Sequence, residues 1–405
     1  MELPRQALQN ALLGLDGRDA DSGGRRLLVW LGWAAPVPEV QRADRMALLR
    51  VALLCGSVFG LVLPRLPRLC AVGAQLDLAA ATGEADLPVI SASGVGLDPG
   101  AAFAACMGEA AERLAQVEMP EDRQGDEAVP LYSWPSGAAR AWPRDLVFRR
   151  AADRRTTLPP FPLSIGCAAG PSPEAARLAA LLEIVERDAV ALWWRGGIAA
   201  DRIPPEHPVA RAAAATNLAL GATPAARPDM LLDITSELGV PTVAAIAFDA
   251  QGHGFCCGTA ARPVMADAAR AAMMERAQNE LAVALAEAKR AALGPQALTP
   301  RDHAHLHRHA AVTVAVLSIL PASGNPRGLA MPGLGFAEIA ARLLACGHEV
   351  LLHDHRRDWL GMHVSRVFVT GLACEPSSDT PPRLAAAIRG TGGGPGLRLP
   401  VSLFS

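Results

Sequence analysis

Three stretches of the sequence carry pairs of oxygen-bearing side chains three residues apart. They are Glu109-Ala-Ala-Glu112-Arg113, Glu183-Ile-Val-Glu186-Arg187 and Glu275-Arg-Ala-Gln278. Residues with this spacing project from one face of a helix, so each pair would lie side by side. Carboxylate and amide oxygens suit a hard cation such as Mg²⁺, and the arginine that ends two of the stretches suits phosphate oxygens.

The second stretch lies in a segment that we predict to be a buried helix. Residues 172–194 are apolar nearly all round, which is typical of a helix enclosed in a core. Carboxylates buried there cost several kcal/mol each unless they are paired or bind a metal. One E-x-x-E-R motif alone is more typical of an exposed helix face with a local ion pair. Two copies favour a site for Mg²⁺ and nucleotide phosphates between helices 101–116 and 174–194, without a Walker motif.

Composition limits the class of protein. The chain has 405 residues, of which 51% are hydrophobic and 19% charged, so global disorder is excluded. A formal net charge of −2 provides no bulk attraction for nucleic acid or an acidic membrane. The N-terminus has no signal-peptide pattern, and the longest apolar run, residues 51–64, is too short to span a membrane. Eight cysteines without a C-x-x-C pair favour reduced thiols in a cytoplasmic protein.

Helix and strand patterns alternate along the chain and predict a mixed α/β fold. We expect an irregular, Pro-rich and charged connection over residues 119–163. The expected domain limits are an N-terminal part over 1–90, a catalytic region over 91–390 and a Gly/Pro-rich tail over 391–405. The expected helices cover about 98–116, 172–194, 267–293 and 336–346, and the expected strands 27–31, 230–235, 240–248, 312–319 and 364–369.

An ordered set of motifs resembles the YcaO family. The segment around the second Glu pair is similar to the family pattern S-x-G-x-A-x-G, then E-A, then E-x-x-E-R-D. The first Glu pair resembles an earlier family motif, and Glu275 to Gln278 resembles its A-x-x-E-x-x-Q helix. The matching stretches are Leu163-Ser-Ile-Gly-Cys-Ala-Ala-Gly170, Pro173-Glu-Ala175, Leu182-Glu-Ile-Val-Glu-Arg-Asp188, Gly108-Glu-Ala-Ala-Glu-Arg113, Leu232 to Pro241, Ala268 to Gln278, Asp354 and Val364 to Leu372.

The resemblance implies a YcaO-type fold of mixed β-sheets flanked by helices, with the ATP site between the Glu-bearing helices. It implies an ATP-dependent enzyme that phosphorylates a peptide backbone amide, releasing ADP and phosphate. The Mg²⁺ ligands would be Glu109, Glu112, Glu183 and Glu186. The catalytic arginines would be Arg113 and Arg187. The other residues contacting nucleotide or metal would be Ser164, Glu174, Glu275 and Gln278.

The resemblance leaves the chemistry and the partners open. The preferred function is cyclodehydration of Cys, Ser or Thr to azolines in a ribosomally made precursor peptide. The alternatives are a thioamide-forming enzyme, or a weakened paralogue that serves as a scaffold or regulatory subunit. The ending Leu399-Pro-Val-Ser-Leu-Phe-Ser405 lacks the Pro-x-Pro-x-Pro ending of many azoline-forming members, which favours the scaffold. With no leader-binding module evident in residues 1–90, we expect a separate E1-like partner protein, and a homodimer is possible.

Three other features have simpler interpretations. The alternating histidines 303, 305, 307 and 309 could bind metal, but a solvated surface segment is the default. Gly333-Leu-Gly335 with Asp354 imitates a dinucleotide-binding fingerprint, but its third Gly is missing. Trp193-Trp194 and Cys256-Cys257 are expected to be core residues.

Overall fold

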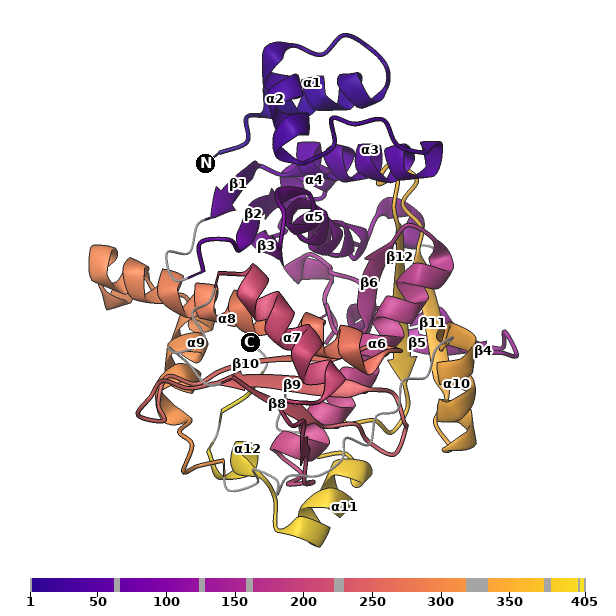
Figure 1. Cartoon of the computed structure of the whole chain (residues 1–405). Coiled ribbons are helices and arrows are strands. Elements are labelled where there is room, and N and C mark those ends of the chain that lie inside the picture. Colours follow the sequence, from indigo (N-terminus) through magenta and orange to yellow (C-terminus); the bar gives the residue numbers. More distant parts are fainter. Residues whose placement is uncertain are drawn as a thin grey trace. The chain divides into compact units, whose positions relative to one another are not determined.

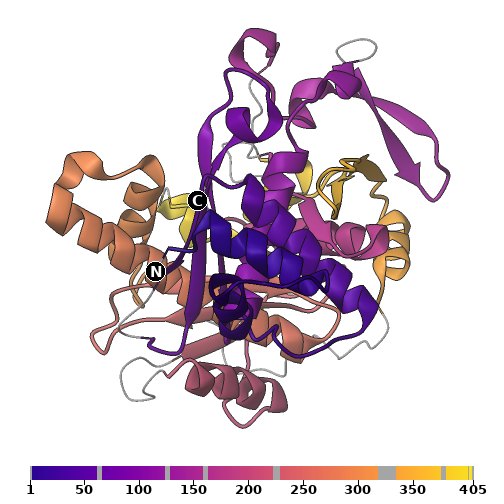
Figure 2. The ribbon, with the colours of Figure 1, turned by 90° about the horizontal axis from the view of Figure 1, so that it is seen from above.

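The computed structural model describes residues 2–61, 66–123, 128–157, 163–221, 229–317, 334–374, 380–399 and 401–403. The chain forms two compact units (Figures 1 and 2). Unit 1 comprises Met1–Val62, Leu69–Leu181 and Glu349–Phe368, and unit 2 comprises Leu63–Arg68, Leu182–His348 and Val369–Ser405. The chain therefore leaves unit 1 and returns to it, and the long helix α6 (Pro173–Trp194) belongs partly to each unit.

Unit 1 begins with three helices and a three-stranded antiparallel sheet in the order β1-β2-β3. Asp98 caps the following helix, α5, by accepting a hydrogen bond from the Ala101 N–H at 2.8 Å, and Pro99 fills its first turn. α5 packs on this sheet, and Phe103 meets Trp33 edge to face with ring centroids 5.6 Å apart. The elements are α1 (Arg5–Leu15), α2 (Ser22–Trp30), α3 (Glu39–Leu54), β1 (Ser57–Leu61), β2 (Cys70–Asp77), α4 (Leu78–Thr82), β3 (Val89–Gly96) and α5 (Pro99–Ala115).

The second sheet of unit 1 has the strand order β5-β4-β11-β12-β6, so β5 and β6 are its edges. β4 and β5 form an antiparallel hairpin, and β6 pairs antiparallel with β12. The short helix η1 precedes the hairpin in the sequence, and η2 and η3 follow it. The elements are η1 (Pro120–Arg123), β4 (Ala128–Trp134), β5 (Ala139–Pro143), η2 (Arg144–Leu146), η3 (Ala152–Arg154), β6 (Cys167–Gly170), β11 (Val350–His355) and β12 (His363–Val369).

Unit 2 is built on a four-stranded sheet in the order β10-β9-β8-β7, with α7 and α8 packed against each other. The strand pairs are antiparallel, and β9 and β10 are buried along their whole length. The elements are β7 (Asp201–Arg202), α7 (Pro208–Ala219), β8 (Asp229–Asp233), β9 (Thr242–Ala247), β10 (Cys256–Ala261), α8 (Met265–Leu293), η4 (Pro295–Ala297), α9 (Pro300–Ala311), α10 (Phe336–Ala345), α11 (Pro382–Thr391) and α12 (Pro395–Arg398).

The mixed α/β class and the four expected helices are confirmed, as are the strands near 230–235, 240–248 and 364–369. Two predictions are wrong. Residues 27–31 are not a strand, because they complete α2, which Asp21 caps through the Gly24 N–H at 2.7 Å. Residues 119–163 are not wholly irregular, because they contain the hairpin β4–β5. In the region expected as a strand over 312–319, residues 312–317 form a turn, and the rest lies outside the described residues.

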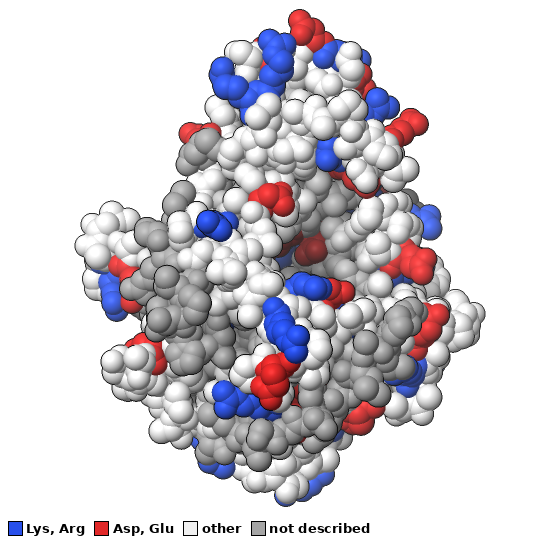
Figure 3. All heavy atoms as spheres, viewed as in Figure 1, with Lys and Arg blue, Asp and Glu red and all other residues white. Residues whose placement is uncertain are grey.

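The surface carries acidic and basic groups together. The face seen in Figure 3 shows Lys and Arg interspersed with Asp and Glu, in agreement with the small net charge. No helix in the described part of the chain is long and apolar enough to cross a membrane.

Gly94 marks the closest approach of β3 to α5. A Cβ atom placed there would lie 2.2 Å from the Cys106 nitrogen and 2.5 Å from the Ala102 carbonyl oxygen, both backbone atoms. We expect Gly94→Ala to lower the free energy of unfolding by about 1–3 kcal/mol. Gly108→Ala, on α5 with open space around it, is the matched control and should raise that free energy by up to about 1 kcal/mol. Urea unfolding measures both, and equal values would contradict the close approach.

Candidate functional site

The first Glu pair lies on the last turns of α5 in unit 1. Glu109 accepts a hydrogen bond from the Ser93 N–H of β3 at 2.7 Å and pairs with Arg113 one turn away. Both side chains are partly exposed, 27% for Glu109 and 18% for Arg113. β3 is an edge strand, so its outward N–H would otherwise lack a strand partner. The Glu109 carboxylate thus accepts a hydrogen bond from the edge strand of the sheet and forms an ion pair with Arg113.

Glu112 performs the same role at another edge of unit 1. Its Oε1 accepts a hydrogen bond from the Ala169 N–H at 3.0 Å, and Ala169 lies on the edge strand β6. The two glutamates of the first motif therefore cap the edges of two different sheets. This fixes both carboxylates by backbone donors rather than by flexible side chains.

The second Glu pair lies on the part of α6 that belongs to unit 2. Arg187 donates to Glu183 at 3.0 Å, and the two side chains are 20% and 25% exposed. Glu186 accepts from the Thr259 hydroxyl at 2.6 Å and from the Ala261 N–H at 3.3 Å, both on the edge strand β10. The surrounding residues of α6 are buried, as predicted, but Glu186 reaches partners at the sheet edge and Glu183 pairs with Arg187. Both motifs also contain the local Glu–Arg ion pair of the simpler interpretation.

Glu275 meets Glu186 at the same residue of β10. The Thr259 N–H donates to Glu275 at 2.7 Å while its hydroxyl donates to Glu186. This arrangement repeats that of Ser93 and Glu109 in unit 1, with 16 residues between donor and acceptor in each case. Each unit therefore contains an edge strand followed by a helix whose glutamate returns to that strand.

Glu186 and Glu275 both accept hydrogen bonds from Thr259, and two neighbouring carboxylates favour binding of a cation. Burial and the neighbouring Glu275 raise the pKa of Glu186 to about 8, although Arg187 and Thr259 oppose the shift. Burial also raises the pKa of Glu275. Mg²⁺ is usually held by one or two carboxylates together with substrate phosphates, so this pair fits the ion. No three His, Cys, Asp or Glu side chains in the described ranges are already grouped as a complete metal cage.

The raised pKa of Glu186 predicts how stability depends on pH in metal-free buffer with a chelator. The folded state holds this proton up to about pH 8, whereas the ordinary value is 4.5. The stability that it contributes is fully present below about pH 4.5 and is lost as pH rises through about 8. We expect the free energy of unfolding to fall over that window and the slope to decrease in Glu186→Gln. An unchanged slope in the variant would contradict the assignment.

The other predicted site residues are less strongly constrained. Glu174 is exposed in the first turn of α6, and Ser164 is half-buried in the turn before β6. Gln278 is half-buried one turn after Glu275 on α8. The roles of these three residues remain predictions. Ser93 and Thr259 were not predicted as site residues. They donate to the glutamates from edge strands, and no sequence motif marks them.

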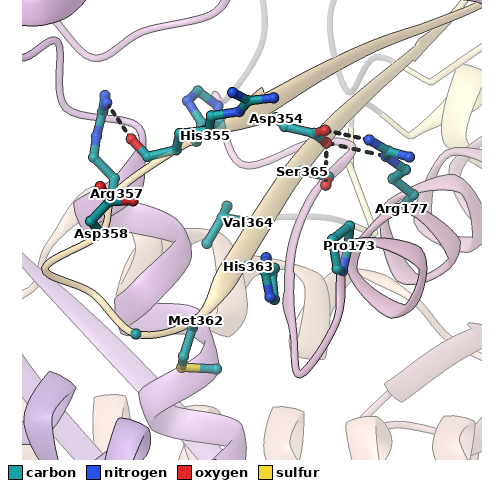
Figure 4. Close-up of a pocket in the computed structure, with 12 residues that line it drawn as sticks. Pro173, Arg177, Asp354, His355, Arg357, Asp358, Met362, His363, Val364 and Ser365 are labelled. Atoms are coloured by element: carbon teal, nitrogen blue, oxygen red, sulfur yellow. Dashed lines mark hydrogen bonds and ion pairs between the residues drawn. The ribbon is translucent and has the colours of Figure 1, made fainter.

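A separate cavity of about 550 Å³ lies in unit 1, where the first turns of α6 approach β11 and β12 (Figure 4). Asp354 accepts from the Ser365 hydroxyl at 2.7 Å and from the Arg177 Nε at 3.2 Å. Arg177 and Ser365 lower the pKa of Asp354 against the effect of burial. None of the predicted catalytic, cofactor or metal residues lines this cavity. Among the described residues, both ring nitrogens of His355, which lines it, have no hydrogen-bond partner.

The simpler interpretations of the remaining features are mostly confirmed. Trp193 and Trp194 are core residues, each 2% exposed, and Cys256 and Cys257 are buried. The histidine segment forms α9. The surface interpretation is wrong for His305, which is buried and whose Nδ1 accepts a hydrogen bond from Arg308 at 2.8 Å. Gly333 of the dinucleotide fingerprint lies outside the described residues. β11, which contains Asp354, pairs antiparallel with β4, unlike the parallel strands of a dinucleotide-binding sheet.

Comparison with known proteins identifies the class. Residues 116–373 match the family described as YcaO cyclodehydratase, ATP- and Mg²⁺-binding. The chain belongs to the YcaO family, as its motifs predicted, and ATP and Mg²⁺ are the cofactors of that family. No curated protein matches the chain.

Solved structures share the fold at low sequence identity. A heterocyclase in complex with substrate and cofactor has a TM-score of 0.63 and 17% identity, over 82% of this chain and 52% of that one. The chain thus spans about half the length of that heterocyclase. YcaO from Methanopyrus kandleri, bound with AMPPCP and Mg²⁺, has a TM-score of 0.59 and 21% identity, covering 84% and 92%. The E. coli microcin synthetase McbBCD complex gives 0.56 and 13%, covering 77% and 86%.

Proposed function

We propose that this chain uses ATP and Mg²⁺ to activate backbone amides of a ribosomally made precursor peptide, and that it closes Cys, Ser or Thr side chains into azoline rings. Family membership carries the proposal. It is supported by three of the four carboxylates of the E-x-x-E-R motifs, Glu109, Glu112 and Glu186, which backbone N–H groups hold at sheet edges.

We assign the metal to Glu109, Glu112, Glu183 and Glu186, with Glu275 and Gln278 beside it and Ser164 and Glu174 contacting nucleotide. When bound, Mg²⁺ neutralises phosphate charge and positions the nucleotide. Arg113 and Arg187 would stabilise the charge on the transferred phosphoryl group, because guanidinium forks match phosphate oxygens. The paired glutamates preorganise these arginines, since each already holds one end of its guanidinium in place.

The chain would not need a nucleophile of its own for this reaction. The attacking group is the side chain of the substrate, and the enzyme orients the activated amide and excludes water from it. The eight cysteines, all within the described residues, form no disulfide, which agrees with a reducing compartment such as the cytoplasm. A separate E1-like protein would deliver the leader part of the precursor peptide and so raise its local concentration.

Calorimetry with ATP and Mg²⁺ tests the nucleotide site on the full chain. We expect saturable binding that a chelator abolishes, because carboxylate ligands alone repel the phosphates. Binding that does not require Mg²⁺ would contradict the proposed ligands. Absence of binding by the folded protein would leave the alternative of a scaffold or regulatory subunit.

Mass spectrometry of the precursor peptide, incubated with ATP and the partner protein, separates the two chemistries. Loss of one water per ring indicates azolines, and replacement of oxygen by sulfur with added sulfide indicates thioamides. An ATP-binding chain that changes no peptide mass would contradict both.

A further inference from the structure

Arg149 is a half-buried arginine of unit 1 that lies outside the Glu-bearing motifs. It follows η2 on the segment that pairs with the end of α5, where its N–H donates to the Gln116 carbonyl oxygen at 2.6 Å. Its Nη2 lies 3.4 Å from the Gln116 Oε1. Gln116 is fully buried, and it stands three residues after Arg113 on the same helix face. Arg149 is therefore a neighbour of the proposed catalytic arginine.

The surroundings of Arg149 are strongly positive. Arg113, Arg155 and Arg366 lie close enough that, together with burial, they lower its pKa to about 10. Among the described residues, neither Arg149 nor Arg155 has a carboxylate within ion-pair distance, while Arg113 is paired with Glu109. Arg155 is exposed, whereas the half-buried guanidinium of Arg149 costs free energy without a counter-ion, so the surroundings of Arg149 favour a bound anion.

Donors without partners point to the same conclusion. The Nε2 of Gln116 and the Nε atoms of Arg113 and Arg149 are buried and find no hydrogen-bond acceptor among the described residues. Buried polar groups in folded proteins are almost always hydrogen-bonded, and each exception calls for a partner such as a bound ion. These three donors come from two segments that are held together by the Arg149–Gln116 contacts.

We propose that Arg149, with Arg113 and the side-chain amide of Gln116, forms a phosphate-binding subsite in unit 1. The oxygens of one phosphate could accept from the unpartnered donors of Arg149, Arg113 and Gln116 together. Guanidinium forks also bind tetrahedral oxyanions in a bidentate way. The choice of phosphate rests on the proposed function, which supplies it either as the terminal phosphoryl group of ATP or as released orthophosphate.

The test compares the full-length wild type with Arg149→Gln and a matched control, Arg140→Gln. Arg140 belongs to the same unit, but its side chain is 59% exposed and pairs with Glu349. Thermal unfolding is followed in sodium phosphate and in sodium chloride of equal ionic strength, and orthophosphate affinity is measured by calorimetry. We expect phosphate to stabilise the wild type and the control, and Arg149→Gln to bind it at least about tenfold more weakly.

Arg149→Gln should remain folded, because it removes a buried charge that lacks a carboxylate partner. Arg149→Lys is the second variant, which keeps the charge but not the fork, and we expect an intermediate phosphate affinity. An equal response to phosphate in the wild type and Arg149→Gln would overturn the proposal. An equal loss in Arg140→Gln would overturn it too, because the effect would then be one of bulk charge.

Nucleotide titrations separate the two sources of the phosphate and the two proposals. Weaker binding of Mg²⁺-ATP with unchanged Mg²⁺-ADP in Arg149→Gln assigns the subsite to the terminal phosphoryl group. Unchanged binding of both nucleotides with weaker orthophosphate assigns it to the released product. A wild type that binds orthophosphate through Arg149 but no nucleotide would refute the proposed function and leave the subsite in place.

Discussion

Replacing Glu186 by Gln is expected to reduce ATP turnover at least about a hundredfold, the size of effect seen when one preorganised electrostatic group is removed from a catalytic site. The substitution keeps the shape of the side chain, and the Thr259 hydroxyl can still donate to its oxygen. The substitution removes the negative charge of Glu186 beside Glu275, and a divalent cation needs that charge for binding. Peptide-dependent release of phosphate measures turnover.

The same variant is expected to be more stable in metal-free buffer. Burial and Glu275 raise the pKa of Glu186, so the ionised carboxylate is costly in the folded protein, and a neutral amide is cheaper to bury. Loss of activity together with a gain in stability is the signature of a group retained for its charge. Glu287→Gln, on the exposed face of α8, is the control and should change neither quantity. A Glu186→Gln protein that is more stable and fully active would exclude the metal role.

The helices that carry the glutamates could be predicted because their determinants are local. Asp98 and Pro99 mark the start of α5, and apolar periodicity marks α6 and α8. The spacing within each Glu pair is equally local. Identification of the helix faces that bear candidate ligands therefore needed no knowledge of the fold.

The partners of the glutamates could not be predicted, because they are distant in sequence. Glu112 and Ala169 are 57 residues apart, and Glu186 and Thr259 are 73. These contacts depend on which strands lie at sheet edges, and strand order is not encoded in the residues that take part. The boundary between the two units, at Leu181 and Leu182, falls inside α6, where composition does not change.

Two errors of secondary structure have different causes. For α2, the apolar run at Leu27 outweighed the cap at Asp21, although Leu27, Leu28 and Leu31 have a helical spacing and are buried. For the hairpin, the prolines at 130 and 143 discouraged a strand assignment. Pro143 is tolerated because β5 is an edge strand.

Replacing Asp188 by Ala should produce the largest loss of stability, about 3 kcal/mol in the free energy of unfolding. Asp188 is fully buried on α6, where it accepts from the Ala373 N–H at 2.8 Å and from Arg383 of α11 at 3.0 Å. Without the Asp188 carboxylate, Arg383 keeps only its ion pair with Glu237, and the Ala373 N–H loses its acceptor. Burial alone would raise the pKa of Asp188 further, and Arg383 counteracts it, so the pair functions as a unit.

Asp267→Ala is the control within unit 2, because its pair with Arg270 is about half exposed, at 51% and 55%, and should contribute at most about 1 kcal/mol. Urea unfolding of both variants measures the difference. Similar values would show that the buried pair does not anchor α6. The anchor matters for function because Asp188 is two residues from Glu186 and so projects from a different face of the helix. By binding α11 on that face, it fixes the rotation of α6 that directs Glu186 toward Thr259.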